Sequence, residues 1–576
     1  MTRKRNWGPG LVVSAESVTG MAVLLLSLVP SNSWLDALRS SSDPASAKLM
    51  AGATLFRVSL AALGAFLIVG RYRGFWETDS GTRGVTNESG YGARLALVLL
   101  AAGAALRLYG LNRGLWVDEV TTLVEYVRPS LGDIVTTYGS QNQHFLFSVL
   151  AHLSITAFGE SVWSLRLPAA LFGIATLWAL WRLGLELTSP REALLSMALL
   201  TFSYPHIWFS QNARGYSALL FWTIASSYYL VRGLRERSRR LWAAYAVAVA
   251  LGMYTHLTMA FVVAGQFAAY VWDAARRRHE SWEDRLAPFF GGFLLAGLLT
   301  IVCYAIVLPQ MPDSAAADLS NVAEWRSLGW LLREFGRGVN AGPLVGLAVV
   351  AGLTGVGSGC VSYLRESPVL PILFIVPVVS GGATMIALGH HLWPRFFLFA
   401  AGFAILIAVR GATVVATAFG RWLALPRERS TKLATVGTVL IAAAMARSIP
   451  YVYRPKQDYE GAKRFVEADR QPGDAVASAG VAALAFRAYY APEWRTVSTL
   501  AELDAIRAAS ARTWLLYTLP IEMANTYPEI YESARKDFHV IRTFDGSLGD
   551  GAIYVLRADR TATANARNGV AIMETR

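Results

Sequence analysis

Long apolar segments recur along the first 450 residues of the chain, and they constrain its fold more than any other feature. A helix needs about 20 mostly apolar residues to cross the hydrocarbon core of a bilayer. The chain has 576 residues, of which 54% are hydrophobic and only 16% are charged. This composition is too apolar for an ordinary soluble protein. The sequence therefore predicts an α-helical polytopic membrane protein.

About thirteen segments are predicted to span the membrane. The first follows the basic residues of MTRKR and resembles a signal peptide. It lacks a convincing small-residue cleavage site and many spans follow it, so we interpret it as an uncleaved helix. The predicted spans lie near residues 11–30, 51–70, 93–110, 163–183, 193–209, 215–233, 241–255, 257–273, 287–308, 343–362, 368–388, 395–410 and 433–448.

The net charge of +13 is distributed unevenly. From Arg454 onward there are 16 basic and 16 acidic residues, so the excess lies in the membrane part, which favours a topology signal over a nucleic-acid surface. In the thirteen-span arrangement, loops on the N-terminal side hold 24 Lys and Arg, and the opposite loops hold 10. Because cytoplasmic loops are enriched in basic residues, we expect an inner-membrane protein with its N-terminus inside.

The chain divides into consecutive parts. Two additional helices are expected in 1–92, the main transmembrane domain in 93–450, with a long outer loop at 111–166, and a polar tail at 561–576. Residues 451–560 have the composition and pattern of a small α/β domain. The predicted topology places this domain on the extracytoplasmic side. We expect outer-loop helices at 130–138 and 143–158, an interfacial helix at 325–335, domain helices at 458–469, 501–510 and 521–538, strands at 474–480 and 513–519, and a closing antiparallel pair at 539–546 and 551–558.

An adjacent acidic pair, Asp118 and Glu119, follows the apolar run that ends at Tyr109. On the predicted topology it lies on the outer side, at the start of the long loop. One interpretation is an interfacial loop in which Trp116 anchors at the headgroups and the acids are merely solvated. The other is a general base beside the membrane.

Other polar residues recur at predicted helix ends on the same side. Each alone is explained by a side chain that reaches the interface or caps a helix. Their recurrence at one membrane depth favours a polar cavity or a ligand site, because ionisable groups are costly in hydrocarbon. They are Gln143, His144, Gln211, Arg214, His256, His390, His391 and Arg395.

One carboxylate with several cations suits transfer of a sugar from a polyprenyl phosphate. Asp118 would accept the proton of the attacking acceptor, Glu119 would orient or bind the acceptor, and Arg or His would stabilise the departing phosphate. A single base predicts inversion at the anomeric carbon. A metal held by Asp118, Glu119, His144 and His391 is the competing interpretation, but no HExxH-like spacing is present. We therefore expect that no cofactor is required.

Several blocks also resemble a known family. They read RLYGLNRGLWVDEV, HFLFSVLAHL, FGESVWSLRLPAALFG, WFSQNARGYSALL, YTHLT and PRFFLF in this order. They are similar to family 39-like glycosyltransferases of the GT-C superfamily, which include protein O-mannosyltransferases and lipid A aminoarabinose transferases. The resemblance implies a GT-C fold and a polyprenyl-phosphate-linked donor, with Asp118 as base and with His144 and Arg214 lining the donor site.

Three departures from the family pattern leave the sugar and the acceptor open. Asn212 stands where many bacterial members have Glu, Phe145 stands where they have Pro, and two spans precede the usual start. The acceptor could be a lipid, a glycan or a protein. Two other classes remain as alternatives. A flippase of lipid-linked sugar would need ionisable residues at mid-membrane and internal symmetry, and a non-catalytic scaffold would make Asp118 dispensable.

Overall fold

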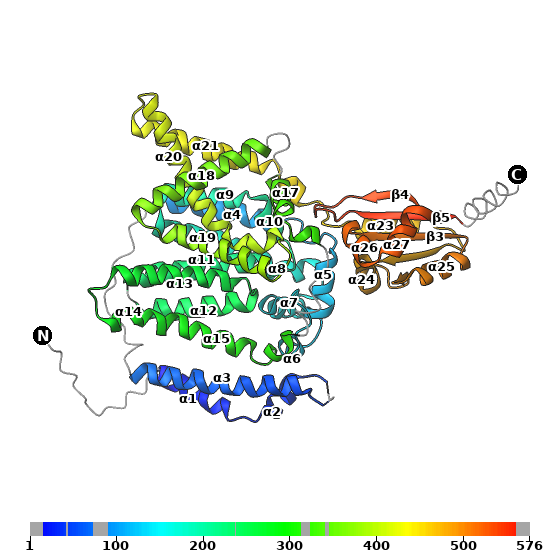
Figure 1. The fold of residues 1–576 in the computed structure, drawn as a ribbon, viewed down its shortest axis with the longest axis horizontal. Coiled ribbons are helices and arrows are strands. Elements are labelled where there is room, and N and C mark those ends of the chain that lie inside the picture. Colours follow the sequence, from blue (N-terminus) through cyan, green and yellow to red (C-terminus); the bar gives the residue numbers. More distant parts are fainter. Residues whose placement is uncertain are drawn as a thin grey trace.

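The computed structural model describes residues 15–41, 44–72, 90–236, 238–312, 323–339 and 345–559. It is an α-helical membrane protein with a C-terminal α/β domain, as the sequence predicts. Figure 1 shows most of the long helices side by side and the C-terminal domain at one end of them. Helices α1 (Ala15–Ser27), α2 (Ser31–Leu38) and α3 (Ala47–Tyr72) lie at one edge of the bundle.

Most residues of the expected spans are helical where the structure describes them. Six helical segments among the described residues are long and apolar enough to cross a membrane, or seven if α1 and α2 form one bent span. The others are shorter, broken or less apolar, so the count of thirteen stays a prediction. The long helices after α3 are α4 (Gly90–Leu108), α8 (Val162–Leu187), α11 (Tyr216–Glu236), α12 (Arg239–Thr255), α13 (Met259–Arg276), α15 (Leu295–Tyr304), α18 (Val345–Glu366), α19 (Val369–Ala387), α20 (Ala401–Trp422) and α21 (Arg427–Ala446).

A proline breaks one segment that was predicted to be continuous. The segment 193–209 is not one helix, because α9 (Pro190–Thr201) ends before α10 (Tyr204–Ser210), whose second residue is Pro205. The first predicted span, 11–30, ends at Pro30, and α2 follows outside that span at 94° to α1. The carbonyl groups freed at the α9 break need partners inside a membrane protein. Buried Arg107 supplies them, since its guanidinium donates to the carbonyls of Leu200 and Thr201.

The long outer loop has the two expected helices, α6 (Leu131–Thr136) and α7 (Phe145–Phe158). It also has a short helix that the sequence reading missed, α5 (Val117–Thr121), which continues as the π-helical turn η1 (Thr122–Val127). The acidic pair therefore lies in the first turn of α5, where the helix dipole favours carboxylates.

The expected interfacial helix at 325–335 is seen as η4 (Ala323–Arg326) and α17 (Leu328–Val339).

The C-terminal domain has one five-stranded sheet of order β2-β1-β3-β5-β4. Strand β1 (Ala475–Ala479) is parallel to β2 (Arg495–Val497) and β3 (Arg512–Thr518), and β5 (Ile553–Asp559) is antiparallel to β3 and β4 (His539–Phe544). Helices α23 (Tyr459–Asp469) and α25 (Leu500–Ala509) confirm the prediction. The helix expected at 521–538 is divided at Pro528 into α26 (Pro520–Thr526) and α27 (Pro528–Asp537). Strand β2, helix α24 (Val481–Ala485) and the turn η7 (Phe486–Tyr490) were missed.

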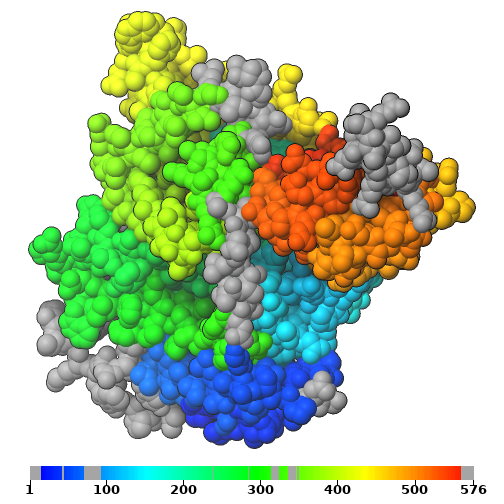
Figure 2. All heavy atoms as spheres, turned by 45° about the vertical axis from the view of Figure 1, so that its right-hand side comes forward, coloured from blue at the N-terminus to red at the C-terminus, as the bar shows by residue number. Residues whose placement is uncertain are grey.

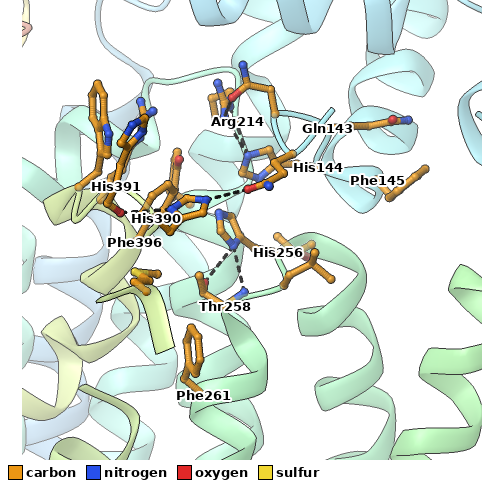
Figure 3. Close-up of a pocket in the computed structure, with 18 of the residues that line it drawn as sticks. Gln143, His144, Phe145, Arg214, His256, Thr258, Phe261, His390, His391 and Phe396 are labelled. Atoms are coloured by element: carbon orange, nitrogen blue, oxygen red, sulfur yellow. Dashed lines mark hydrogen bonds between the residues drawn. The ribbon is translucent and has the colours of Figure 1, made fainter. Parts of the chain in front are cut away.

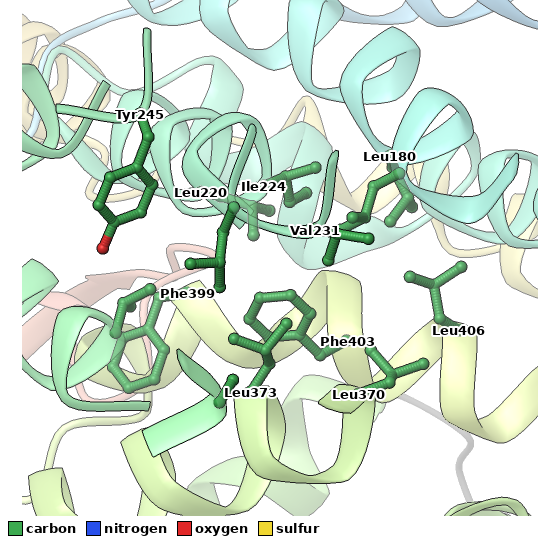
Figure 4. Packing of buried hydrophobic residues seen from close by; sticks show 14 of the residues in the cluster. Leu180, Leu220, Ile224, Val231, Tyr245, Leu370, Leu373, Phe399, Phe403 and Leu406 are labelled. Carbon is green, nitrogen blue, oxygen red and sulfur yellow. The ribbon is translucent and has the colours of Figure 1, made fainter. Parts of the chain in front are cut away.

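Two large apolar clusters determine how the parts are held together. The first fills the helix bundle and includes Leu220, Phe399 and Phe403 (Figure 4). The second joins the outer loop to the C-terminal domain, since Leu115 and Val120 of the loop pack in one cluster with Tyr459 and Phe486. In Figure 2 the orange and red domain rests against the cyan outer loop. The acidic pair is therefore enclosed between the bundle and the C-terminal domain.

Candidate active site

Asp118 is the carboxylate to which two distant arginines converge. Arg214, in the turn before α11, donates from Nη1 to Asp118 Oδ2 at 2.8 Å. Arg395, in the turn η6 (Pro394–Ala400), donates to the same oxygen at 3.2 Å. The Asp118 side chain is 16% exposed. Two guanidinium groups share one carboxylate, so the site has one more positive than negative charge.

Glu119 points elsewhere and is completely buried. Arg166 of α8 binds it with two hydrogen bonds, of 2.7 and 2.5 Å, and the backbone N–H of Ala213 donates to it at 2.7 Å. Burial opposes its ionisation, but the charges of Arg166 and Lys456 outweigh burial and keep the pKa of Glu119 below its usual value. Glu119 thus fixes the turn that carries Arg214.

His144 and His256 lie beside the two arginines. His144 is the N-cap residue of α7, and Arg214 Nη2 donates to its Nε2 at 3.1 Å. Burial, the main cause, and the charge of Arg214, the next, keep the pKa of His144 well below its usual value. The His144 and His256 rings are 4.8 Å apart. A Cβ at Gly215 would lie 2.6 Å from His144 Nδ1, so only glycine at this position lets the imidazole approach the arginine turn.

These groups line a cavity of about 300 Å³, which we call the histidine cavity (Figure 3). His390 closes one side through a 2.9 Å hydrogen bond from its ring to Gln141. Apolar residues from α13 and α19 line the other side, and two of the lining leucines are also exposed, Leu257 at 45% and Leu388 at 68%. The residues with polar groups that line it include Gln141, Asn142, Gln143, His144, Arg214, His256, Thr258, His390, His391 and Arg395. The cavity therefore combines a cationic end with an apolar edge.

The structure brings most of the residues that the sequence singled out to the histidine cavity, and three do not line it: Asp118, which binds two of the lining arginines, Glu119 and Gln211. His144, Arg214, His256, His391 and Arg395 all line the histidine cavity. Gln211 does not, because its Nε2 donates to the carbonyls of residues 106, 107 and 109 and so caps the C-terminal end of α4. Glu119 cannot bind an acceptor because it has no exposed surface. Its hydrogen bonds to Arg166 and Ala213 hold together the segments on either side.

Three participating residues were not predicted. Arg166 had a signal in the sequence, an arginine at the head of an apolar helix. Asn142 accepts from Arg214 Nη2 at 3.0 Å, and Lys456 donates to the carbonyl of Gln211 at 2.7 Å. No sequence pattern marks Asn142 or Lys456 as a site residue, because each contacts the site only after the chain has folded. Among the described residues, no group of three or more His, Cys, Asp or Glu is placed to hold a metal ion.

Lys456 makes the stability of the domain junction depend on pH. Burial lowers the pKa of Lys456 to about 7, with Glu119 opposing the shift. Because the unfolded chain keeps the ordinary, higher lysine pKa, folding is penalised below pH 7 and the penalty is relieved as pH rises from 7 toward the unfolded pKa. We expect the unfolding temperature of the wild type to rise over this interval relative to that of Lys456→Met, measured by thermal scans at several pH values. Parallel curves for the two proteins would contradict this assignment.

One known family model matches part of the chain. Residues 142–309, less than half of the chain, match the family model described as dolichyl-phosphate-mannose-protein mannosyltransferase. The matched segment holds His144, Arg214 and His256. The match supports the resemblance to membrane glycosyltransferases seen in the sequence. The match supports transfer of a lipid-linked sugar as the reaction class.

Several solved structures are similar to this chain in outline. ArnT from Cupriavidus metallidurans, bound to undecaprenyl phosphate, is 12% identical over 81% of this chain and 98% of its own, with a TM-score of 0.46. The Archaeoglobus fulgidus oligosaccharyltransferase tethered to an acceptor peptide is 10% identical over 80% and 73%, with a TM-score of 0.44. Arabinosyltransferase EmbB from Mycobacterium smegmatis is 11% identical over 69% and 43%, with a TM-score of 0.39. No curated protein sequence matches the chain.

Proposed function

We propose that the chain is an inverting glycosyltransferase that moves a sugar from a polyprenyl-phosphate carrier to an acceptor on the outer face of the cytoplasmic membrane. The observation that carries this proposal is the pairing of Asp118 with Arg214 and Arg395, the two arginines that line the histidine cavity. The excess of basic residues in the opposite loops supports the outer-face orientation.

The chemistry follows from the two oxygens of Asp118. Both ion pairs use Oδ2, which leaves Oδ1 to accept the proton of the acceptor hydroxyl or amine as the acceptor attacks the anomeric carbon. The bond from that carbon to the phosphate oxygen breaks, and the electron pair leaves with the lipid phosphate. Arg214 and Arg395 stabilise the developing charge, because charge-assisted hydrogen bonds to phosphate are strong. One displacement inverts the anomeric centre.

The apolar edge of the histidine cavity supports a donor that arrives from the bilayer. Leu257 and Leu388 line the cavity and are exposed, where a prenyl tail could contact them while the phosphate reaches the arginines. His144 is held neutral beside Arg214, so it accepts a hydrogen bond from the guanidinium rather than repelling it. The positive charge of the site is thus concentrated on the two arginines.

The test is cleavage of the donor by purified protein. Undecaprenyl phosphate carrying a radiolabelled hexose or pentose is incubated with the protein and a cell-envelope extract, and release of undecaprenyl phosphate is measured. We expect release that depends on the extract. A flippase would move the lipid across a vesicle membrane without breaking the sugar–phosphate bond. Movement of intact lipid without release would contradict the proposal.

Arg214→Ala should weaken donor binding. A hydrogen bond to a charged group is worth about 1.5–3 kcal/mol, so we expect undecaprenyl phosphate to bind about ten- to a hundredfold more weakly. Binding can be measured by titration of the lipid into protein in detergent. Arg128→Ala is the matched control, because Arg128 lies in the same outer loop in an exposed pair with Glu160. Equal affinity of both variants would remove Arg214 from the phosphate site.

A further inference from the structure

A second cavity, of about 400 Å³, lies on the other side of Arg395. Trp116, Trp208, Trp325, Trp330 and Trp393 line it, and we call it the tryptophan cavity. It lies between the bundle and the C-terminal domain, since residues 546–550 of the domain also line it. Trp208 Nε1 donates to the hydroxyl of Ser547 at 3.0 Å across this junction. Its volume is within the range of small-molecule sites.

The two cavities adjoin at Arg395, which donates to the proposed base Asp118. Tyr216, Trp393 and Arg395 line both of them. The guanidinium of Arg395 stacks 4.1 Å above the Trp393 ring and donates to Asp118. Asp118 itself is not among the residues that line either cavity, so a group held in the tryptophan cavity is close to the base through Arg395.

Asn212 gives the tryptophan cavity a buried hydrogen-bond donor without a partner in the part of the chain that the structure describes. Its side chain is completely buried, and its Oδ1 accepts from Trp116 Nε1 at 3.2 Å. This bond fixes the amide orientation. Its Nδ2 has no hydrogen-bond partner among the described residues, although Asn212 lines the cavity. Because a buried donor without a partner is costly, a ligand oxygen at this position would be favourable.

On the basis of the proposed function, we propose that the tryptophan cavity binds the acceptor and that the acceptor is a carbohydrate. Indole rings offer flat apolar faces that suit the C–H faces of a sugar ring. Asn212, Glu334, Arg454 and Asp550 lie among them, and hydroxyl groups can both donate to and accept from such a set. A lipid tail would instead require a mainly aliphatic lining, and Leu519 and Leu548 are the aliphatic side chains here apart from proline.

The chemical class is tested by locating the transferred label. Purified full-length protein is incubated with radiolabelled sugar on undecaprenyl phosphate and a cell-envelope extract, and the product is then treated with protease. Label in protease-resistant glycan or glycolipid is expected. Label released as small peptides would overturn the carbohydrate assignment while leaving the proposed function intact. If undecaprenyl phosphate is not released at all, the proposed function itself fails and this inference fails with it.

Two variants test the location. Asn212→Asp keeps the oxygen that accepts from Trp116 and removes the free donor, and we expect the acceptor KM to rise about tenfold while the donor KM is unchanged. Trp330→Phe should raise the acceptor KM in the same direction. Trp422→Phe is the control, because Trp422 is 77% exposed at the end of α20. Equal acceptor KM values in Asn212→Asp and Trp422→Phe, or a donor KM that rises equally, would overturn the assignment of this cavity to the acceptor.

Discussion

Asp118→Asn is expected to reduce sugar transfer by about a thousandfold, because a positioned general base contributes roughly 10²–10⁴ in rate. The amide oxygen of Asn can still accept from Arg214 and Arg395, so the two arginines keep a partner. It cannot take up a proton as a carboxylate does. The measurement is release of undecaprenyl phosphate from labelled donor in the presence of the envelope extract.

The control for this loss is Asp504→Asn, in the C-terminal domain, where the Asp504 side chain is 56% exposed. It should release lipid phosphate at the wild-type rate. Binding of undecaprenyl phosphate to the Asp118→Asn protein should persist, because the arginines that hold the phosphate are unchanged. Wild-type turnover by Asp118→Asn would show that another group removes the acceptor proton.

Glu119→Gln is expected to cost about 3–5 kcal/mol of stability, because it leaves the guanidinium of Arg166 buried without a counter-charge. The loss is measured as a lowered unfolding temperature of the purified protein. Arg166→Met should be destabilising for the converse reason. The double variant Glu119→Gln, Arg166→Met should recover part of the loss, because neither charge is then left without its partner.

Glu160→Gln is the matched control for this pair. Arg128 and Glu160 form the same kind of ion pair on the same outer loop, but their side chains are 39% and 43% exposed. Exposed pairs contribute about 0–1 kcal/mol, so the unfolding temperature should barely change. If Glu119→Gln is no more destabilising than Glu160→Gln, the buried pair does not hold the arginine turn in place.

Much of this architecture was predictable because it depends on local patterns. Apolar segments of sufficient length predicted the helices of the bundle, and the alternating pattern near residues 539–558 predicted the antiparallel pair β4–β5. The breaks were missed where Pro205 and Pro528 interrupt otherwise helical sequence. Each proline lies inside a segment whose overall pattern predicts one continuous helix, and the helix boundary at the proline was therefore not predicted.

The site was predictable as a set of residues and less so as a set of roles. His144, Arg214, His256 and Arg395 lie at helix ends at one depth, and the fold brings them together. The same criterion selected Gln211, which caps α4, because a polar residue at a helix end can cap or bind a ligand. Asp118 and Glu119 are adjacent on helix α5 but bind different arginines, which the sequence could not show because Arg166, Arg214 and Arg395 are distant in the chain.

The most direct measurement is an experimental structure of the full chain with undecaprenyl phosphate bound. We expect the phosphate oxygens within about 2.7–2.9 Å of the guanidinium groups of Arg214 and Arg395, beside Oδ1 of Asp118. The prenyl chain should leave past Leu257 and Leu388. A phosphate bound away from both arginines, with Asp118 out of reach of the lipid headgroup, would contradict the proposed active site.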